Sequence, residues 1–245
     1  MVWRPSLPLP GYWVRPRLLS VIAGELLFRA TRLLIASLDL RCDGLEQLRT
    51  LRREGRPIIF VGWHGQYLLN FGAFRRILGP EARGAIMVRN DPNGLVLIRF
   101  SRRMNVAVVS LDHDLETPHW GQAVVEMARL VRQGHDGMIA VDGPEGPAHR
   151  VKPGAAVLAQ KTGAVLVPVG GAASRSLQLR YRWDRQLIPL PGSRTVIHLG
   201  APVDASSSNG ARPNVDELVQ RIAEAIDAAT VRAEELCRKA SASNL

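Results

Sequence analysis

Two short loops in the chain carry side chains that can transfer a proton. His64 directly follows an apolar run and stands in Gly62-Trp63-His64-Gly65, where the glycines let backbone and substrate approach closely. A neutral imidazole at this place can take a proton from a hydroxyl near pH 7. The same position also suits a structural histidine beside a buried strand.

The second loop, Asp142-Gly143-Pro144-Glu145-Gly146-Pro147, holds two carboxylates between rigid prolines and small glycines. Such a loop can bind an anion through its N–H groups or direct a carboxylate at a histidine. A plain turn is the alternative interpretation. Arg150 and Lys152 follow closely, and their cationic side chains can hold a phosphate.

A third group of side chains suggests a different chemistry. The loop 111–120 offers carboxylates and imidazoles, which are ligands for zinc or manganese: Asp112, His113, Asp114, Glu116 and His119. Their spacing matches no familiar helical metal motif such as H-E-x-x-H, and an exposed acidic loop that caps the next helix is the alternative. The nucleophile motif G-x-S-x-G and the phosphate-binding motifs G-x-x-x-x-G-K-S/T and G-x-G-x-x-G are absent from the sequence.

Strand-like and helix-like patterns alternate along the chain and position these loops. We expect buried strands over 56–62, 84–88, 105–110, 137–141 and 164–170. Helices are expected between them over 66–78, 92–104, 120–133 and 154–162. This alternation predicts a single α/β domain with a mostly parallel central sheet flanked by helices. Ligands bind such sheets beyond the carboxyl ends of the strands, which is where His64 and Asp142 stand.

The remainder of the chain predicts strand pairing and a closing helix. Residues 177–183 and 194–200 read as antiparallel strands, and 214–239 reads as an amphipathic helix. We therefore divide the chain into a membrane-contacting N-terminal region (1–40), an α/β domain (41–205) and a C-terminal helix packed on the same domain (206–245).

The N-terminal region is amphipathic and too short in its apolar runs to span a membrane. The apolar positions Leu19, Ile22, Leu26 and Leu33 recur at helical spacing, but charged residues interrupt them. Aromatic residues and arginines precede this stretch, a combination that suits the boundary between water and lipid headgroups: Trp3, Arg4, Tyr12, Trp13, Arg15 and Arg17. The alternative is a helix that covers the protein's own core, and one helix can do both.

The charge distribution points toward an anionic partner. The net charge is +10, and residues 1–110, with 17 basic and 7 acidic side chains, account for that whole excess. An anionic membrane, an anionic substrate and nucleic acid all fit this balance, as does a solvated arginine-rich face. Aromatic residues are only 5% of the chain and no RNA-binding aromatic motif is present, so we expect no nucleic acid partner. The two cysteines, Cys42 and Cys237, stand in no metal or redox spacing and fit a reducing compartment.

Taken in order, the motifs resemble the lysophospholipid acyltransferase superfamily, and most closely its bacterial branch long labelled a domain of unknown function. The resemblance rests on Glu54-Gly55-Arg56-Pro57 through Trp63-His64-Gly65, on Asp142 through Pro147, on Lys152-Pro153-Gly154 and on Val167-Pro168-Val169. It covers roughly residues 25–205 and includes the stretch 172–203.

The resemblance implies a glycerol-phosphate-acyltransferase-like fold and a peripheral-membrane acyltransferase. Such an enzyme moves a fatty acyl group from an acyl thioester, either acyl-CoA or acyl carrier protein, to a hydroxyl of a lipid acceptor. It implies no metal and no cofactor, because the acyl thioester is a co-substrate. Anionic membrane lipids are the expected partners, and the cytoplasmic face of the inner membrane is the expected location.

The resemblance also assigns roles to residues. His64 is the expected general base, and Asp142 is the carboxylate expected to orient it, with Glu145 and Asp91 as the next choices. The superfamily's usual aspartate, five residues after the histidine, is here Leu69. Expected substrate-binding residues are Trp63, Gly65, Arg89, Arg99, Gly143, Gly146, Arg150 and Lys152. The usual phosphate-binding E-G-T-R reads here Glu145-Gly146-Pro147-Ala148, without its arginine.

Two other functions remain open at this point. One is a metal-dependent hydrolase of a lipid or phosphoester that uses His64 with the 111–120 cluster. The other is a non-catalytic protein that binds anionic lipid.

Overall fold

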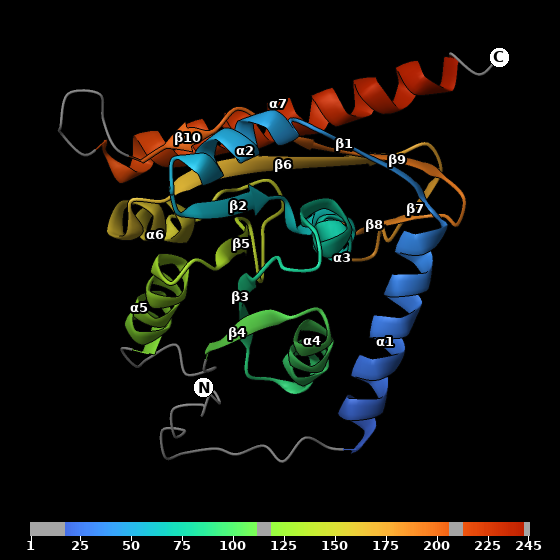
Figure 1. The fold of residues 1–245 in the computed structure, drawn as a ribbon. Coiled ribbons are helices and arrows are strands. Elements are labelled where there is room, and N and C mark those ends of the chain that lie inside the picture. Colours follow the sequence, from blue (N-terminus) through green and yellow to red (C-terminus); the bar gives the residue numbers. More distant parts are fainter. Residues whose placement is uncertain (1–17, 112–118, 206–212, 243–245) are drawn as a thin grey trace.

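Buried apolar runs build a central sheet, as the alternation of patterns predicts. The computed structural model describes residues 18–111, 119–205 and 213–242, and strands of these ranges pair into one sheet in the order β1-β9-β6-β2-β5-β3-β4, with β10 beside β6 (Figure 1). Its strands are β1 (Asp39–Asp43), β2 (Ile58–Gly62), β3 (Gly84–Arg89), β4 (Val106–Leu111), β5 (Asp136–Ala140), β6 (Val165–Ala173), β9 (Arg194–Leu199) and β10 (Val203–Asp204). A separate hairpin pairs β7 (Ser176–Gln178) with β8 (Leu187–Pro189).

Most neighbouring strands run parallel. The pairs β6–β2, β2–β5, β5–β3 and β3–β4 are parallel, while β9 and β10 run antiparallel to β6. The edge strand β1 runs parallel to β9 and therefore opposite to β2. The prediction of an α/β domain with a mostly parallel central sheet flanked by helices is confirmed.

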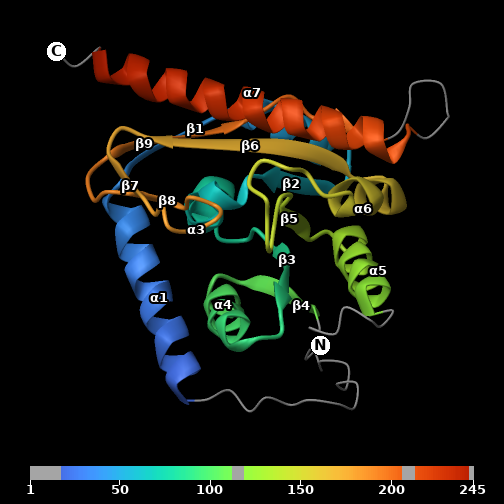
Figure 2. The ribbon, with the colours of Figure 1, turned by 180° about the vertical axis from the view of Figure 1, so that it is seen from behind.

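Helices cover both faces of the sheet, because side chains of a strand point alternately to opposite faces. Ile59 and Val61 of β2 belong to the core under α5 (His119–Arg132), α6 (Gly154–Thr162) and α7 (Val215–Ala242). Ile58 and Phe60 belong to the core on the other face, with α1 (Leu18–Ser37), α2 (Leu45–Arg53), α3 (Tyr67–Leu78) and α4 (Pro92–Arg103). Figure 2 shows α7 running along β6 and α1 standing beside α4.

The expected strand pair 177–183 with 194–200 is wrong. Only Ser176–Gln178 of the first range is a strand, and it pairs with β8, whereas β9 pairs with β1 and β6. Residues 176–178 are all exposed, so no buried face holds them to the sheet. The chain instead turns over 179–186 and folds back. Strand β1 and helix α2 were not expected. Strand β1 is short and polar, whereas α2 does carry a helical pattern, because Leu45, Leu48 and Leu51 recur every three residues and the last two are buried.

Helix α1 has two apolar faces. Phe28, Thr31 and Ile35 are buried against the domain, whereas Leu19, Leu26 and Leu33 are 75%, 61% and 73% exposed. One face of this helix therefore covers the core, as one interpretation expects, and the other presents leucines outward; contact of that face with a membrane stays a prediction. No helix in the described part of the chain has the length and hydrophobicity needed to cross a bilayer. The aromatic and basic residues predicted to lie at the lipid boundary fall within 1–17, outside the described residues.

Candidate active site

The strand directions bring the two candidate loops together. Strands β2 and β5 are parallel neighbours, so the residues that follow them meet at one edge of the sheet. His64 begins a single 3₁₀ turn, η1 (His64–Gln66), directly after β2, and Asp142 follows β5. The backbone N–H of His64 donates to Oδ1 of Asp142 at 2.8 Å.

The imidazole of His64 is held by a carboxylate that the sequence did not indicate. Its Nδ1 lies 2.7 Å from Oδ2 of Asp184, whose side chain is completely buried. An ionised carboxylate only accepts hydrogen bonds, so Nδ1 carries the hydrogen in this pair and Nε2 keeps the lone pair. The ring of His64 remains 26% exposed. This arrangement gives one accessible basic nitrogen fixed in direction by its partner.

Asp184 reaches the site on the loop 179–186 between β7 and β8. Strand β6 runs parallel to β2 and ends at the same edge of the sheet, so the hairpin that follows it folds over η1. Gln186 donates from Nε2 to the carbonyl of Gly65 at 2.9 Å. A Cβ on Gly65 would lie 2.2 Å from the carbonyl oxygen of Asp184, so only glycine permits this approach.

Arg182 holds the same carboxylate from the other side. Its Nε donates to Oδ1 and its Nη2 to Oδ2 of Asp184, each at 2.8 Å. Burial raises the pKa of the Asp184 carboxyl, but the hydrogen bonds from Arg182 and His64 and the positive charge of Arg182 outweigh it, so the pKa lies below its usual range. The carboxylate is therefore ionised at neutral pH and remains an acceptor for His64.

Asp142 does not orient the ring, so that expectation is corrected. Its two oxygens accept backbone N–H groups, Oδ1 from His64 and Oδ2 from His149 at 3.0 Å. The side chain is 1% exposed, and both oxygens are satisfied by main chain. Asp142 thus ties the loop after β5 to the turn that carries His64 and fixes the backbone of the site.

Glu145 and Asp91 form ion pairs with Arg89 and not with the His64 ring. Glu145 is 66% exposed and accepts from Nη1 of Arg89 at 2.7 Å. Asp91 caps α4 by accepting from the N–H of Gly94 at 2.7 Å, and it lies 3.2 Å from Nε of Arg89. Arg89, an expected substrate-binding residue, therefore connects the end of β3 with the loop after β5.

The glycines of the second loop leave room for the rings of the site. A Cβ on Gly143 would lie 2.8 Å from Cδ2 of His64, and one on Gly146 would lie 2.6 Å from the indole of Trp183. The Trp183 ring in turn lies 5.0 Å from the His64 ring, centroid to centroid. Both glycines therefore shape the site by allowing close packing.

Trp63 is a buried wall of the site. It is 2% exposed, donates from Nε1 to Oδ1 of Asp227 on α7 at 2.9 Å, and stacks on the ring of His149 at 4.8 Å. These contacts connect the closing helix with the residue that precedes His64. Direct contact of Trp63 with a substrate stays a prediction.

The remaining cationic residues that were expected to bind substrate make their described contacts away from the His64 ring. The stem of Arg99 on α4 packs against Gly24 of α1. Arg150 is exposed, and the backbone N–H of Lys152 donates to the carbonyl of Val141 at 2.8 Å. Neither the contacts of Arg99 nor that of Lys152 involves the His64 ring.

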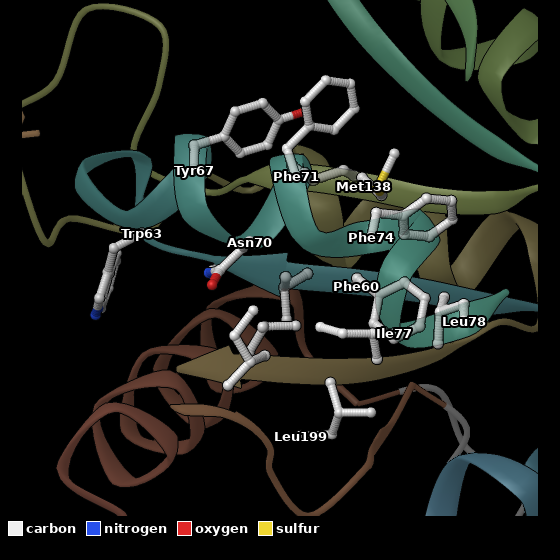
Figure 3. Close-up of a pocket in the computed structure, with 15 residues that line it drawn as sticks. Phe60, Trp63, Tyr67, Asn70, Phe71, Phe74, Ile77, Leu78, Met138 and Leu199 are labelled. Atoms are coloured by element: carbon white, nitrogen blue, oxygen red, sulfur yellow. The ribbon is translucent and has the colours of Figure 1, made fainter. Parts of the chain in front are cut away.

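An apolar pocket opens beside the site between α3 and the sheet. Its cavity volume is about 50 Å³, so it is narrow, and it is partly open to solvent. Gly62, Trp63 and Tyr67, which flank His64 in the sequence, line one end; Phe74, Ile77 and Leu78 line its continuation along α3 (Figure 3). Asn70 is a polar side chain on the pocket wall.

The metal interpretation finds no support in the described part of the chain. Within residues 18–111, 119–205 and 213–242, no three histidine, cysteine or acidic side chains gather as metal ligands. Asp112, His113, Asp114 and Glu116 lie outside the described residues, and the side chain of His119 does too. Cys237 is buried, Cys42 is half-buried, and no disulfide joins the two.

Sequence reasoning missed Asp184, Arg182 and Trp183. The stretch 172–203 contributes to the family resemblance, but its alternating pattern favoured a strand over 177–183, and a strand would not have directed an aspartate at His64. The single available signal was the dense polar run Arg180-Tyr181-Arg182-Trp183-Asp184-Arg185, which is unusual for a buried strand.

Comparisons with known proteins give a sequence relative and solved structures of similar fold. No protein-family model matches the chain. The chain is similar in fold to the crystal structure of the 1-acyl-sn-glycerophosphate (LPA) acyltransferase PlsC from Thermotoga maritima, with a TM-score of 0.47 and 22% identity over 85% of this chain and 80% of that chain. It is 32% identical to the uncharacterized protein RP090 of Rickettsia prowazekii (strain Madrid E) over 170 residues, 66% of this chain and 69% of that protein. At this identity and coverage, the chain belongs to the same family as RP090.

Proposed function

We propose that the protein is a peripheral-membrane acyltransferase of the lysophospholipid acyltransferase superfamily. It transfers a fatty acyl group from an acyl thioester, acyl-CoA or acyl carrier protein, to a hydroxyl of a lipid acceptor. The observation that carries this proposal is the His64–Asp184 pair at 2.7 Å, placed where β2 ends and beside an apolar pocket. The ordered sequence motifs around His64 and Asp142 support the same reaction.

In this reaction His64 is the general base. Nε2 takes the proton of the acceptor hydroxyl while the oxygen of that hydroxyl attacks the carbonyl carbon of the thioester. The ionised Asp184 stabilises the resulting imidazolium. When the carbon–sulfur bond breaks, the imidazolium gives the proton to the leaving sulfur. The acyl group leaves as an ester of the acceptor and the thiol is released, so no covalent acyl-enzyme forms.

The apolar pocket suits the hydrocarbon chain of the donor. An acyl chain that enters past Tyr67 would move from water onto an apolar surface. That surface consists of Phe71, Phe74, Ile77 and Leu78. Each buried methylene group contributes about 0.8 kcal/mol. Binding energy gained along the chain can thus hold the thioester carbonyl near Nε2, which is the positioning that this reaction requires.

The exposed face of α1 suits attachment to a membrane surface. Leu19, Ile22, Leu26 and Leu33 point outward along this helix, and Leu97 of α4 is also exposed. A helix that presents leucines beside arginines lies in the plane of the lipid headgroups. Together with the basic balance of residues 1–110, this face supports contact with anionic lipids, at the cytoplasmic face of the inner membrane.

A transfer assay tests the proposal. Purified protein on anionic vesicles is given labelled acyl-CoA or acyl-loaded carrier protein and a panel of lysolipids and glycolipids, and the product ester is identified by mass spectrometry. We expect transfer by the wild type and its loss in His64→Ala. Equal transfer by both proteins would contradict the mechanism, and turnover that a chelator abolishes would favour the hydrolase alternative. Vesicle binding with no turnover of any donor would favour a lipid-binding protein.

A further inference from the structure

The β7–β8 hairpin presents an apolar face to solvent. Leu187 packs against the core on the α3 side of the sheet and Pro189 is buried, so these alternate residues of β8 hold the hairpin on the domain. The opposite face carries Ile188, its cross-strand partner Leu177, and Leu190. Leu177 is 53% exposed and Leu190 is 40% exposed. Solvated faces of antiparallel strands usually carry polar residues, so these leucines are placed for contact with an amphipathic partner.

The loop 179–186 of this hairpin has a buried side and an exposed side. On the buried side, Asp184 and Gln186 bind the turn η1. On the exposed side, the ring of Tyr181 is 84% exposed. It lies in a segment whose outward residues are Arg180, Tyr181 and Arg185. The loop therefore completes the candidate active site with one side and presents an aromatic ring among arginines with the other.

The exposed charge of the hairpin is positive. Residues 174–193 contain four arginines and one acid, Asp184, whose side chain is completely buried. Arg182 pairs with that acid. The positive charges that remain belong to exposed side chains: Arg175, Arg180 and Arg185. An anionic partner is complementary to this segment.

The hairpin adjoins the end of α1, whose outer face is also apolar. The N–H of Asp39, just after α1, donates to the carbonyl of Ser193 at 3.2 Å, and the N–H of Ser193 donates to the carbonyl of Leu190 at 3.0 Å. Figure 1 and Figure 2 show the hairpin at the C-terminal end of α1 from both sides. Exposed leucines therefore lie on two adjoining elements, such as Leu33 on α1 and Leu190 after β8.

We propose that the β7–β8 hairpin, with its loop 179–186, binds the surface of an anionic lipid bilayer together with α1. This inference rests on the proposed function, in which α1 is the element that contacts the membrane. The ring of Tyr181 lies at the headgroup boundary, where amphipathic aromatic rings are favoured. Arg180 and Arg185 contact lipid phosphates, and the outward leucines of the hairpin add apolar contact.

This docking places the bilayer next to the candidate active site. Tyr181 and Asp184 are three residues apart, so their Cα atoms lie within roughly 11 Å of each other. Trp183, between them, lies 5.0 Å from the His64 ring, centroid to centroid. The headgroup layer of one leaflet is about 5–8 Å thick. A lipid acceptor can thus present a headgroup hydroxyl to His64 while its hydrocarbon chains stay in the bilayer.

Co-sedimentation with vesicles tests this docking at constant salt. The vesicles contain phosphatidylcholine with phosphatidylglycerol, or phosphatidylcholine alone. The hairpin variant changes three exposed side chains: Arg180→Gln, Tyr181→Gln and Arg185→Gln. The matched control removes two exposed arginines and one exposed apolar side chain from α7, on the other face of the sheet: Arg221→Gln, Val231→Gln and Arg238→Gln.

The hairpin variant should bind anionic vesicles at least about ten-fold more weakly than the wild type, because two cations are removed from the membrane surface. The control should bind as the wild type does, and the effect of the hairpin variant should be smaller on phosphatidylcholine alone. Unchanged binding of the hairpin variant to anionic vesicles, or an equal loss in the control, would overturn the proposal.

One substitution separates lipid contact from folding. Arg185 has a φ of 47°, a left-handed conformation that glycine adopts without strain. Arg185→Gly should keep the melting temperature of the wild type and weaken binding to anionic vesicles by about five-fold. If the hairpin variant does not fold, this single variant decides the question, and full vesicle binding by it would count against the docking.

An acidic protein is the other possible occupant of this surface. A hairpin variant that binds vesicles normally but loses binding to acyl carrier protein would overturn lipid docking and assign the surface to the carrier. Acyl transfer is measured separately. Hairpin-dependent vesicle binding without turnover of any donor would contradict the proposed function and support the docking.

Discussion

Nδ1 of His64 lies 2.7 Å from Oδ2 of Asp184, although 120 residues separate them in the chain. The same oxygen accepts from Nη2 of Arg182 at 2.8 Å. A carboxylate held from one side by a guanidinium and aimed from the other at an imidazole has a single orientation. This relationship connects the hairpin β7–β8 to the end of β2 and is the basis of the following predictions.

Asp184→Asn should lower transfer by on the order of 10²–10⁴-fold, because an amide no longer fixes the tautomer of His64 or stabilises its imidazolium. The matched control is Asp43→Asn. Asp43 also lies 2.7 Å from a histidine nitrogen, Nδ1 of His198, but at the opposite edge of the sheet, where β1 and β9 end. Initial rates with the preferred donor check the prediction, and an equal loss in both variants would show that Asp184 has no special role.

Arg182→Gln should make stability less dependent on pH in the acid range. The folded-state pKa of Asp184 is lowered, so its ionised form stabilises the protein above the unfolded pKa of about 3.9 and this contribution is lost as the pH falls through the folded pKa. Without Arg182, the stability at pH 6 should fall by on the order of 1–3 kcal/mol.

Urea unfolding of the wild type and Arg182→Gln at pH 6 and at pH 3 measures this effect. The difference in unfolding free energy should be present at pH 6 and should shrink as the pH falls through the folded-state pKa of Asp184. A difference that stays the same at both values would show that the arginine stabilises the hairpin by packing alone.

Alanine at two glycines should disturb the site in different ways. In Gly143→Ala the new methyl group would lie 2.8 Å from Cδ2 of His64 and push the ring from its partner, so activity should fall while the fold is kept. In Gly65→Ala the new methyl group would lie 2.2 Å from the backbone oxygen of Asp184. The loop 179–186 must then move, so the melting temperature should fall as well as the activity.

Gly154→Ala is the control for both glycine variants, because a Cβ there meets no atom within 4 Å and the residue begins α6. It should retain activity and melting temperature. Circular dichroism and thermal unfolding separate the two effects, and full activity in Gly143→Ala would contradict the position inferred for the His64 ring.

The combined change Leu19→Gln, Leu26→Gln and Leu33→Gln should weaken binding to anionic vesicles. Burying one leucine is worth roughly 1.5–3 kcal/mol when burial is complete. Partial burial of all three should therefore make a difference of at least about ten-fold in the partition coefficient. Vesicle co-sedimentation measures it at constant salt.

Val125→Gln with Val231→Gln controls for the loss of exposed apolar surface, since these residues are 64% and 52% exposed on α5 and α7 rather than on α1. This control should bind vesicles as the wild type does. Unchanged binding of the triple variant would show that the outward face of α1 does not contact lipid.

Much of the sheet was predictable because its signals are local. The runs that became β2, β3 and β6 are largely buried and read as apolar stretches, β4 and β5 carry shorter apolar runs, and α3, α4, α5 and α6 end near the residues that the pattern indicates. The position of His64 after β2 and of Asp142 after β5 follows from the same local patterns. Their meeting at one edge follows from parallel pairing, which the alternation of helices and strands predicts.

The partner of His64 was not predictable in this way. Three candidate carboxylates were chosen from the sequence. Asp142 and Glu145 lie in the loop that follows β5 and Asp91 caps α4, and none of the three hydrogen-bonds to the ring. Asp142 is bound by backbone N–H groups, and a sequence pattern does not distinguish an aspartate that holds main chain from one that holds a side chain. The choice of Asp184 depends on where β6 ends and on how the exposed segment after it turns.

The sequence by itself determined the order of strands and helices from β2 to β6, the place of His64, the amphipathic character of α1 and the concentration of positive charge in residues 1–110. Local periodicity and composition carry that information, because they act through neighbouring residues. Only the tertiary structure decided which carboxylate meets His64, which face of α1 stays outside and which side of the loop 179–186 is buried. These depend on contacts between segments far apart in the chain, whose geometry is set by strand direction and by the packing of the two helical layers on the sheet.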